Sequence, residues 1–216
     1  MISKNFKKRF YTSVLLLCLL TIMFSSNFIS VYLLIILSTL SILEFLQLTK
    51  KLSVNKFYFN LMNLFFIIYI FSFSFMFFLF SNIHGLKIIL YIILFGCIAS
   101  DIGGFIFGNL FKGPKLTKIS PKKTYSGAIG SVIFSILTVS LFFYYFIRVF
   151  EVKILITAFM ISIFCQIGDL IFSLLKRKAK LKDTGNFLPG HGGILDRLDG
   201  IFLGVPTGFI IFTLLN

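Results

Sequence analysis

The segment that decides the fold runs from Cys165 to Gly200 and reads CQIGDLIFSLLKRKAKLKDTGNFLPGHGGILDRLDG. It connects the polar end of one apolar run to the start of another. The segment contains four of the chain's seven acidic residues and six of its 21 Lys and Arg residues. Because most of the remaining chain is apolar, the polar chemistry of the protein is concentrated here.

The spacing of polar residues in this segment favours two helices that each present a polar face. If the run that enters the segment is helical, Asp169, Ser173 and Lys176 lie at i, i+4 and i+7, on one face. Asp196 and Asp199 lie at i and i+3, at the start of the next apolar helix. Both of these carboxylates can therefore point at a common ligand, and carboxylates in pairs are typical of sites for Mg²⁺.

Between the two helices, residues 189–193 read Pro-Gly-His-Gly-Gly. Glycines allow the backbone to turn sharply and to present N–H groups to an anion. The segment thus combines acidic residues that can bind a metal, basic residues that can bind phosphates, and a glycine-rich loop. Together these features indicate phosphate chemistry.

The composition indicates an all-α polytopic membrane protein with a single domain over residues 1–216. The chain is 58% hydrophobic and only 13% charged, which is not typical of a soluble globule. Apolar runs long enough to span a bilayer predict about seven transmembrane helices, over residues 11–24, 28–48, 57–80, 86–107, 128–147, 154–175 and 201–215. The cytoplasmic loop between the last two covers about 176–199.

The net charge of +14 is explained by membrane topology rather than by nucleic acid, because no basic run lies on a soluble domain and no nucleic-acid motif is present. Lys and Arg gather before Phe10 and in residues 50–56, 112–123 and 176–197, and only Lys87, Arg148 and Lys153 lie elsewhere. The positive-inside rule then places the N-terminus in the cytoplasm and the C-terminus outside.

Two further acids lie within apolar runs. An acid as deep as Asp101 is a functional candidate by default, and the alternative is a carboxylate paired with a Lys of a neighbouring helix. Glu44 is expected to be an interfacial acid near Lys50 and Lys51.

Two motifs resemble those of a known family, the phosphatidate cytidylyltransferases or CDP-diacylglycerol synthases. The first comprises Ser-Leu-Leu-Lys-Arg at 173–177, Lys-Asp at 182–183 and Pro-Gly-His-Gly-Gly-Ile-Leu-Asp-Arg-Leu-Asp at 189–199. The second is Ser-Pro-Lys-Lys-Thr at 120–124, followed by an aromatic residue and Gly127. Ser126 stands where the family has an acid, so any role of that acid is in doubt here.

The resemblance implies transfer of a cytidylyl group from CTP to phosphatidate, which gives CDP-diacylglycerol and pyrophosphate for phospholipid synthesis. The implied cofactor is Mg²⁺, and a second cation is left open. The resemblance and the helical spacing together favour three carboxylates as metal ligands: Asp169, Asp196 and Asp199. The side chains expected to bind phosphates are Lys176, Arg177, Lys182 and Arg197, with Lys122 and Lys123 in second rank.

The remaining candidates have open or auxiliary roles. Ser173 either donates to a phosphate or caps its helix, and Asp183 is favoured as a partner of Lys182 over a role as a ligand. His191 is expected to position the loop or a phosphate rather than to act as a base, because the attacking phosphate oxygen is already ionised near neutral pH. Gly192 and Gly193 are expected to let the backbone approach a phosphate closely.

The predicted location is the inner membrane of a bacterial-type cell, with the active site facing the cytoplasm. The partners implied are CTP, phosphatidate, the bilayer and a second copy of the chain in a homodimer, and no nucleic acid. Two other functions remain open: a CTP-dependent kinase for a polyprenol- or phytol-type alcohol, and a non-enzymatic membrane transporter.

Overall fold

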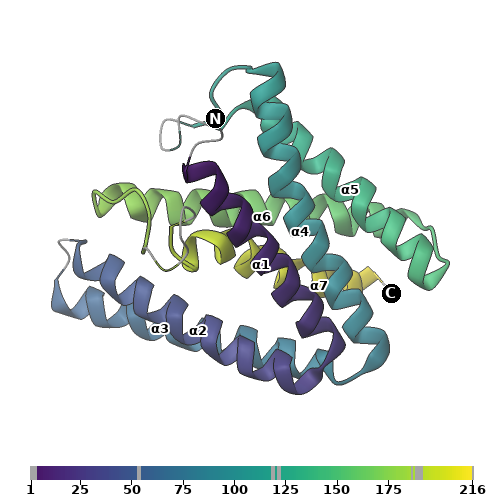
Figure 1. The fold of residues 1–216 in the computed structure, drawn as a ribbon, viewed down its shortest axis with the longest axis horizontal. Coiled ribbons are helices and arrows are strands. Elements are labelled where there is room, and N and C mark those ends of the chain that lie inside the picture. The colour runs from purple at the N-terminus through teal and green to yellow at the C-terminus, as the bar shows by residue number, and fades with distance from the viewer. Residues whose placement is uncertain are drawn as a thin grey trace. The chain divides into compact units, whose positions relative to one another are not determined.

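The computed structural model describes residues 4–52, 55–117, 120, 123–185, 187 and 192–215. Within these ranges the chain is helical and contains no strand, which confirms the predicted all-α fold. The helices, coloured along the chain in Figure 1, are α1 (Lys4–Ser25), α2 (Asn27–Lys50), α3 (Lys56–Ser81), α4 (His84–Phe111), α5 (Tyr125–Ile147), α6 (Val152–Lys178) and α7 (Leu195–Leu215).

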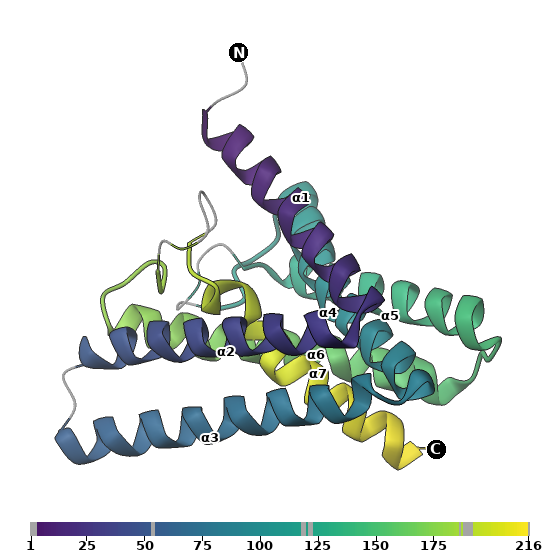
Figure 2. The ribbon, with the colours of Figure 1, turned by 60° about the horizontal axis from the view of Figure 1, so that its bottom comes forward.

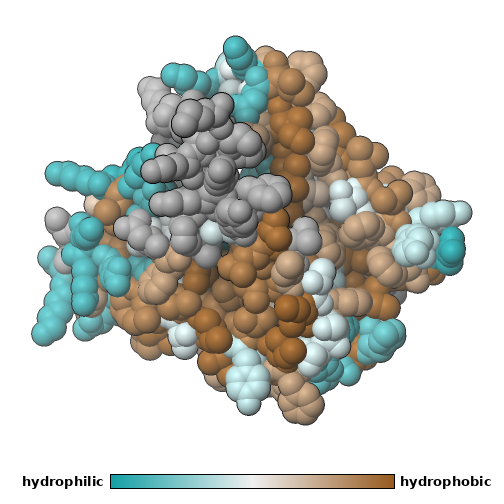
Figure 3. Space-filling model, viewed as in Figure 1, coloured by the Kyte–Doolittle hydropathy of each residue, from teal (hydrophilic) through white to brown (hydrophobic). Residues whose placement is uncertain are grey.

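Six of the described helices, α2 to α7, are long and apolar enough to cross a membrane. The protein is therefore a polytopic membrane protein. Six of the about seven expected spans are thus found among the described residues, and α1 contributes a shorter apolar helix, Val14–Ser25. Large apolar side chains such as Phe28 (82% exposed) and Phe65 (73%) lie on the surface, as expected for contact with lipid. Most of the described surface visible in Figure 3 is hydrophobic.

The chain forms two compact units. The first contains Met1–Asn82 and Leu175–Leu198. In it, α2 and α3 lie side by side as an antiparallel hairpin (Figures 1 and 2). The rings of Phe45 and Phe66 stack with centroids 3.9 Å apart, and Thr49 Oγ1 donates a hydrogen bond of 2.9 Å to Asn63 Oδ1. These contacts fix the register of the hairpin near the end of α2.

The end of α6 packs onto this hairpin inside the first unit. Ala179, which follows α6, lies in one core cluster with Leu48 and Leu52. Leu175 and Leu181 pack against the same cluster. The polar segment that follows α6 therefore begins close to the end of α2.

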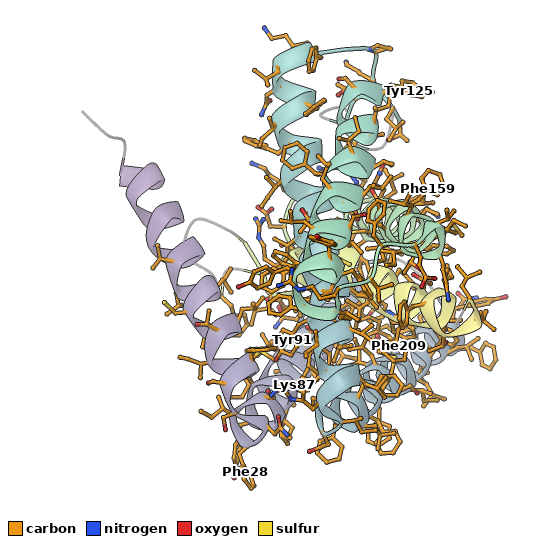
Figure 4. All side chains as sticks on the ribbon, turned by 90° about the vertical axis from the view of Figure 1, so that its right-hand side faces the viewer. Phe28, Lys87, Tyr91, Tyr125, Phe159 and Phe209 are labelled. Atoms are coloured by element: carbon orange, nitrogen blue, oxygen red, sulfur yellow. The ribbon has the colours of Figure 1, made fainter. Side chains whose placement is uncertain are left out.

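The second unit contains Ile83–Leu174 and Asp199–Asn216. Its helices α4 and α5 are in close contact: a Cβ on Gly103 would overlap the carbonyl oxygen of Gly130 and the ring of Phe134. Within the same unit Ser100 and Ser162 share a hydrogen bond of 2.9 Å. Figure 4 shows labelled side chains of this unit, of which Tyr91 and Phe209 are buried.

The boundaries around the polar segment differ from the expected spans. Helix α6 continues to Lys178, and α7 begins at Leu195, ahead of the expected start at 201. Asp196 and Asp199 therefore lie in the first turns of α7, as their spacing predicted. Pro206 lies inside α7, which continues past it to Leu215.

Candidate active site

The centre of the polar segment is a buried ion pair between the end of α6 and the start of α7. Lys176 Nζ lies 2.7 Å from Asp196 Oδ1, and the two side chains are only 10% and 5% exposed. Each residue suits its position, because a cation stabilises the C-terminal turn of a helix and an anion the N-terminal turn. The structure thus pairs two predicted site residues with each other.

The other oxygen of Asp196 bonds to two described residues of the segment between the helices. Its Oδ2 accepts hydrogen bonds from the backbone N–H of Thr184 at 2.8 Å and of Gly193 at 3.0 Å. The bond to Gly193 reaches back three residues, in the manner of a capping box. The anion held by the N–H of Gly193 in this structure is thus a carboxylate of the protein itself.

Gly192 occupies a position that other residues would adopt only with strain. Its φ is +84°, and a Cβ would lie 2.9 Å from Asp196 Oδ2. The sequence predicted close backbone approach at this glycine. In the structure the group approached is Asp196, with Asp183 also adjacent at 3.2 Å from the same Cβ position.

Glu44 is a buried acid whose partners the sequence analysis did not predict. It was expected at the interface near Lys50 and Lys51, but its side chain is 0% exposed. Its carboxylate accepts hydrogen bonds from Thr184 Oγ1 at 2.8 Å and from the backbone N–H groups of Ile194 at 3.0 Å and Leu195 at 2.9 Å. Helix α2 thus presents this acid to the polar segment.

Several of the predicted phosphate-binding side chains belong to the same segment and are exposed. Arg177, Lys182 and Arg197 are exposed, and Arg177 Nη1 donates to the backbone oxygen of Leu181 at 3.1 Å. Asp183 is also exposed, and the expected pair with Lys182 is not among the ion pairs of the described residues. These basic groups therefore lie at the surface of the first unit.

A second group of predicted residues meets in the second unit. Lys123, which precedes α5, forms an ion pair with Asp169 of α6, and Ser173 Oγ donates to Asp169 Oδ1 at 3.2 Å. The Asp169 side chain is 32% exposed. The sequence analysis placed Asp169 and Ser173 on one helix face, and their hydrogen bond confirms it.

Two other candidate site acids of this unit, Asp199 and Asp101, differ in burial. Asp199 is buried, and its Oδ1 accepts from the backbone N–H of Gly200 at 2.9 Å. Asp101 is exposed on α4, and the Cys165 thiol donates to its Oδ1 at 3.7 Å.

Two predicted site residues, Lys122 and His191, lie outside the described residues. Among the residues that are described, no three His, Cys, Asp or Glu side chains gather closely enough to hold a metal ion. The metal set Asp169, Asp196 and Asp199 therefore stays a prediction.

Comparison with known proteins agrees with the motifs. The model of a family described as the cytidylyltransferase family matches residues 1–215. The chain is similar to the phosphatidate cytidylyltransferases of Rickettsia felis (40% identical over 132 residues), Staphylococcus haemolyticus (43% over 136) and Mycobacterium leprae (34% over 125).

These alignments include 56%, 62% and 57% of this chain, and 57%, 52% and 39% of the respective relatives. The chain thus spans about half the length of the curated relatives it matches. The family model, by contrast, extends over nearly the whole sequence. On that match, and in agreement with the resemblance of its two motifs, the chain belongs to the cytidylyltransferase family.

Proposed function

We propose that the protein transfers the cytidylyl group of CTP to phosphatidate in a Mg²⁺-dependent reaction, giving CDP-diacylglycerol and pyrophosphate. The observation that carries this proposal is the buried Lys176–Asp196 pair. It joins the end of α6 to the start of α7, close in sequence to the exposed Arg177, Lys182 and Arg197, in a chain of the cytidylyltransferase family. The relatives named as phosphatidate cytidylyltransferases support the choice of the lipid acceptor.

The chemical problem of this reaction is charge repulsion. A phosphate monoester oxygen of phosphatidate attacks the α-phosphorus of CTP, and the bond from that phosphorus to the bridging oxygen breaks to release pyrophosphate. Two unit charges about 4 Å apart cost roughly 4 kcal/mol at an effective dielectric constant near 20. A site for this reaction must therefore supply positive charge and hold the reacting oxygens in line.

The exposed bases suit this task. Arg177 and Arg197 can make forked contacts to phosphate oxygens, and Lys182 can act as a point charge. Lys176 is buried against Asp196, so we assign to it the orientation of that carboxylate. Lys123 is partly exposed beside Asp169 and is a further candidate for a phosphate contact.

The carboxylates suit a hard cation by the chemistry of their oxygens. Asp196 accepts three hydrogen bonds, and a carboxylate offers about four lone-pair positions, so one position is left for a metal. Asp169 is partly exposed, with Lys123 and Ser173 as partners. Mg²⁺ bound by Asp169, Asp196 and Asp199 would neutralise phosphate charge and stabilise the leaving pyrophosphate.

The test uses purified protein in micelles that contain phosphatidate, with Mg²⁺ and CTP labelled either in cytosine or at the γ-phosphate. We expect the cytosine label to enter the lipid with one pyrophosphate released per lipid labelled. We expect Asp196→Asn to lose this activity. The matched control is Glu151→Gln, which removes the charge of an exposed acid paired with Lys153.

The rival functions give different results in matched assays of the same protein. A lipid kinase would transfer the γ-label to an added polyprenol and leave the cytosine label in solution. A transporter would release no pyrophosphate and would move a cation into liposomes without nucleotide. Either result from folded wild-type protein contradicts cytidylyl transfer.

A further inference from the structure

Glu44 is an acid of the first unit to which the proposed reaction gives no role. It lies in α2, about 140 to 150 residues before its three partners, and its side chain is fully buried. Oε1 accepts the N–H of Ile194, and Oε2 accepts both the N–H of Leu195 and the hydroxyl of Thr184. A buried carboxylate is costly unless it is hydrogen-bonded, and these donors meet that need.

The partners of Glu44 lie at two separate points of the segment between α6 and α7. Thr184 comes six residues after the end of α6 at Lys178, and Ile194 and Leu195 lie where α7 begins. The first turn of a helix has N–H groups without partners inside the helix, and Glu44 accepts from two of these N–H groups at the start of α7. One side chain of α2 therefore bonds both to Thr184 and to the start of α7.

This arrangement connects directly to the Lys176–Asp196 pair. Thr184 donates one hydrogen bond from its hydroxyl to Glu44 and another from its backbone N–H to Asp196. The backbone at Gly185 and Gly193 also packs closely against Glu44. A Cβ on Gly185 would lie 2.6 Å from Oε1, and one on Gly193 would overlap Oε2. A change at Glu44 would thus reach Asp196 through Thr184, which bonds to both carboxylates.

We propose that Glu44 is a positioning residue that holds Thr184, the start of α7 and, through them, Asp196 in the geometry needed for nucleotide binding. Glu44, Thr184, Ile194 and Leu195 form what we term the loop latch. The kinetic part of this inference rests on the proposed cytidylyl transfer. Lys182 lies two residues before Thr184 and Arg197 two residues after Leu195, so the latch sets where these bases lie.

The main test variant is Glu44→Gln. A glutamine side chain keeps one acceptor oxygen, but its NH₂ group must face at least one donor of the latch. Two hydrogen-bond donors then face each other without an acceptor between them. The control is Ser41→Ala, which removes another fully buried polar group of α2 whose hydroxyl bonds only within its own helix, to the Leu37 oxygen. Thr184→Val and Thr184→Ser form a second pair that keeps Glu44 in place.

The first readout does not need activity. Hydrogen exchange by mass spectrometry on the peptide that contains Ile194 and Leu195 reports directly on the amides that donate to Glu44. We expect exchange there to be at least about tenfold faster in Glu44→Gln, since buried donors lose their partner. Ser41→Ala should exchange as the wild type does. Equal exchange in the two variants would overturn the latch.

The second readout is kcat/KM for CTP per folded molecule. Misplacement of a site by about 1 Å can cost about a hundredfold in rate, and we expect a loss of tenfold or more in Glu44→Gln and in Thr184→Val. Thr184→Ser should regain most of that activity because it retains the hydroxyl. Faster exchange with unchanged kcat/KM would reject the positioning role and leave a structural one.

Two outcomes separate this inference from the proposed function. If the wild type transfers no cytidylyl group, the proposed function fails and with it the kinetic role of the latch, while the exchange rates still decide the latch itself. If Glu44→Gln does not fold, the Thr184 pair decides: Thr184→Val must lose activity that Thr184→Ser retains. Equal activity in that pair would overturn the inference.

Discussion

Replacement of Lys176 by Met tests the buried ion pair at the centre of the site. Methionine keeps much of the length of the side chain but removes its charge. Asp196 would then remain 5% exposed and without the cation 2.7 Å from its Oδ1. Removing one partner of a buried pair costs about 3–5 kcal/mol, because the other charge is left uncompensated.

The structure places the expected cost at the lower end of that range. Asp196 Oδ2 keeps its hydrogen bonds from Thr184 and Gly193, so part of the carboxylate remains satisfied. We therefore expect the free energy of unfolding to fall by about 3 kcal/mol in Lys176→Met. The exposed pair Glu151–Lys153, with 46% and 36% exposed side chains, should lose no more than about 1 kcal/mol in Lys153→Met.

The assay is denaturant-induced unfolding of the purified protein in mixed micelles, followed by far-ultraviolet circular dichroism. The double variant Lys176→Met/Asp196→Asn completes the cycle, and it should cost less than the sum of the two single changes. If Lys176→Met costs no more than Lys153→Met, the pair is not buried in the way described, and the assignment of Lys176 to orient Asp196 fails.

Two glycine substitutions give further tests of stability by the same unfolding assay. Gly192→Ala should lose about 1–3 kcal/mol, because alanine is strained at a φ of +84° and its Cβ would press on Asp196; an unfolding curve equal to wild type would contradict that turn. Gly103→Ala should disrupt the contact of α4 with α5, where a Cβ overlaps the Gly130 carbonyl. Gly85→Ala, which has no atom within 4 Å of its Cβ, should be neutral, and equal effects of these two α4 variants would refute the packing described.

Local patterns in the sequence were sufficient to predict the helices and the shared helix face of Asp169 and Ser173. The apolar runs between polar loops predicted helices α2 to α7, because burial in lipid requires such runs whatever the tertiary contacts are. The spacing of Asp169 and Ser173 predicted a shared helix face, since residues four apart meet in any α-helix. Helix ends were less certain, and α7 begins six residues before its expected apolar start.

The parts that the sequence could not predict depend on long-range contacts. Glu44 was expected at the interface because Lys50 and Lys51 follow it closely, whereas its actual partners lie about 150 residues away. Thr184 has no local feature that marks it as the bridge from Glu44 to Asp196. The sequence feature that pointed to Glu44 was an acid within an apolar run, because such an acid usually has a buried partner.

The separation of Glu44 from its partners also has a consequence for how the protein is made. Synthesis adds about 5–20 residues per second, so α2 leaves the ribosome roughly 8–30 s before Leu195 does. During that interval the carboxylate has none of the three donors that satisfy it in the finished structure. Until α7 has been made, α2 must therefore either keep this carboxylate near water or bury it in the membrane at a cost of about 2.5–3.5 kcal/mol.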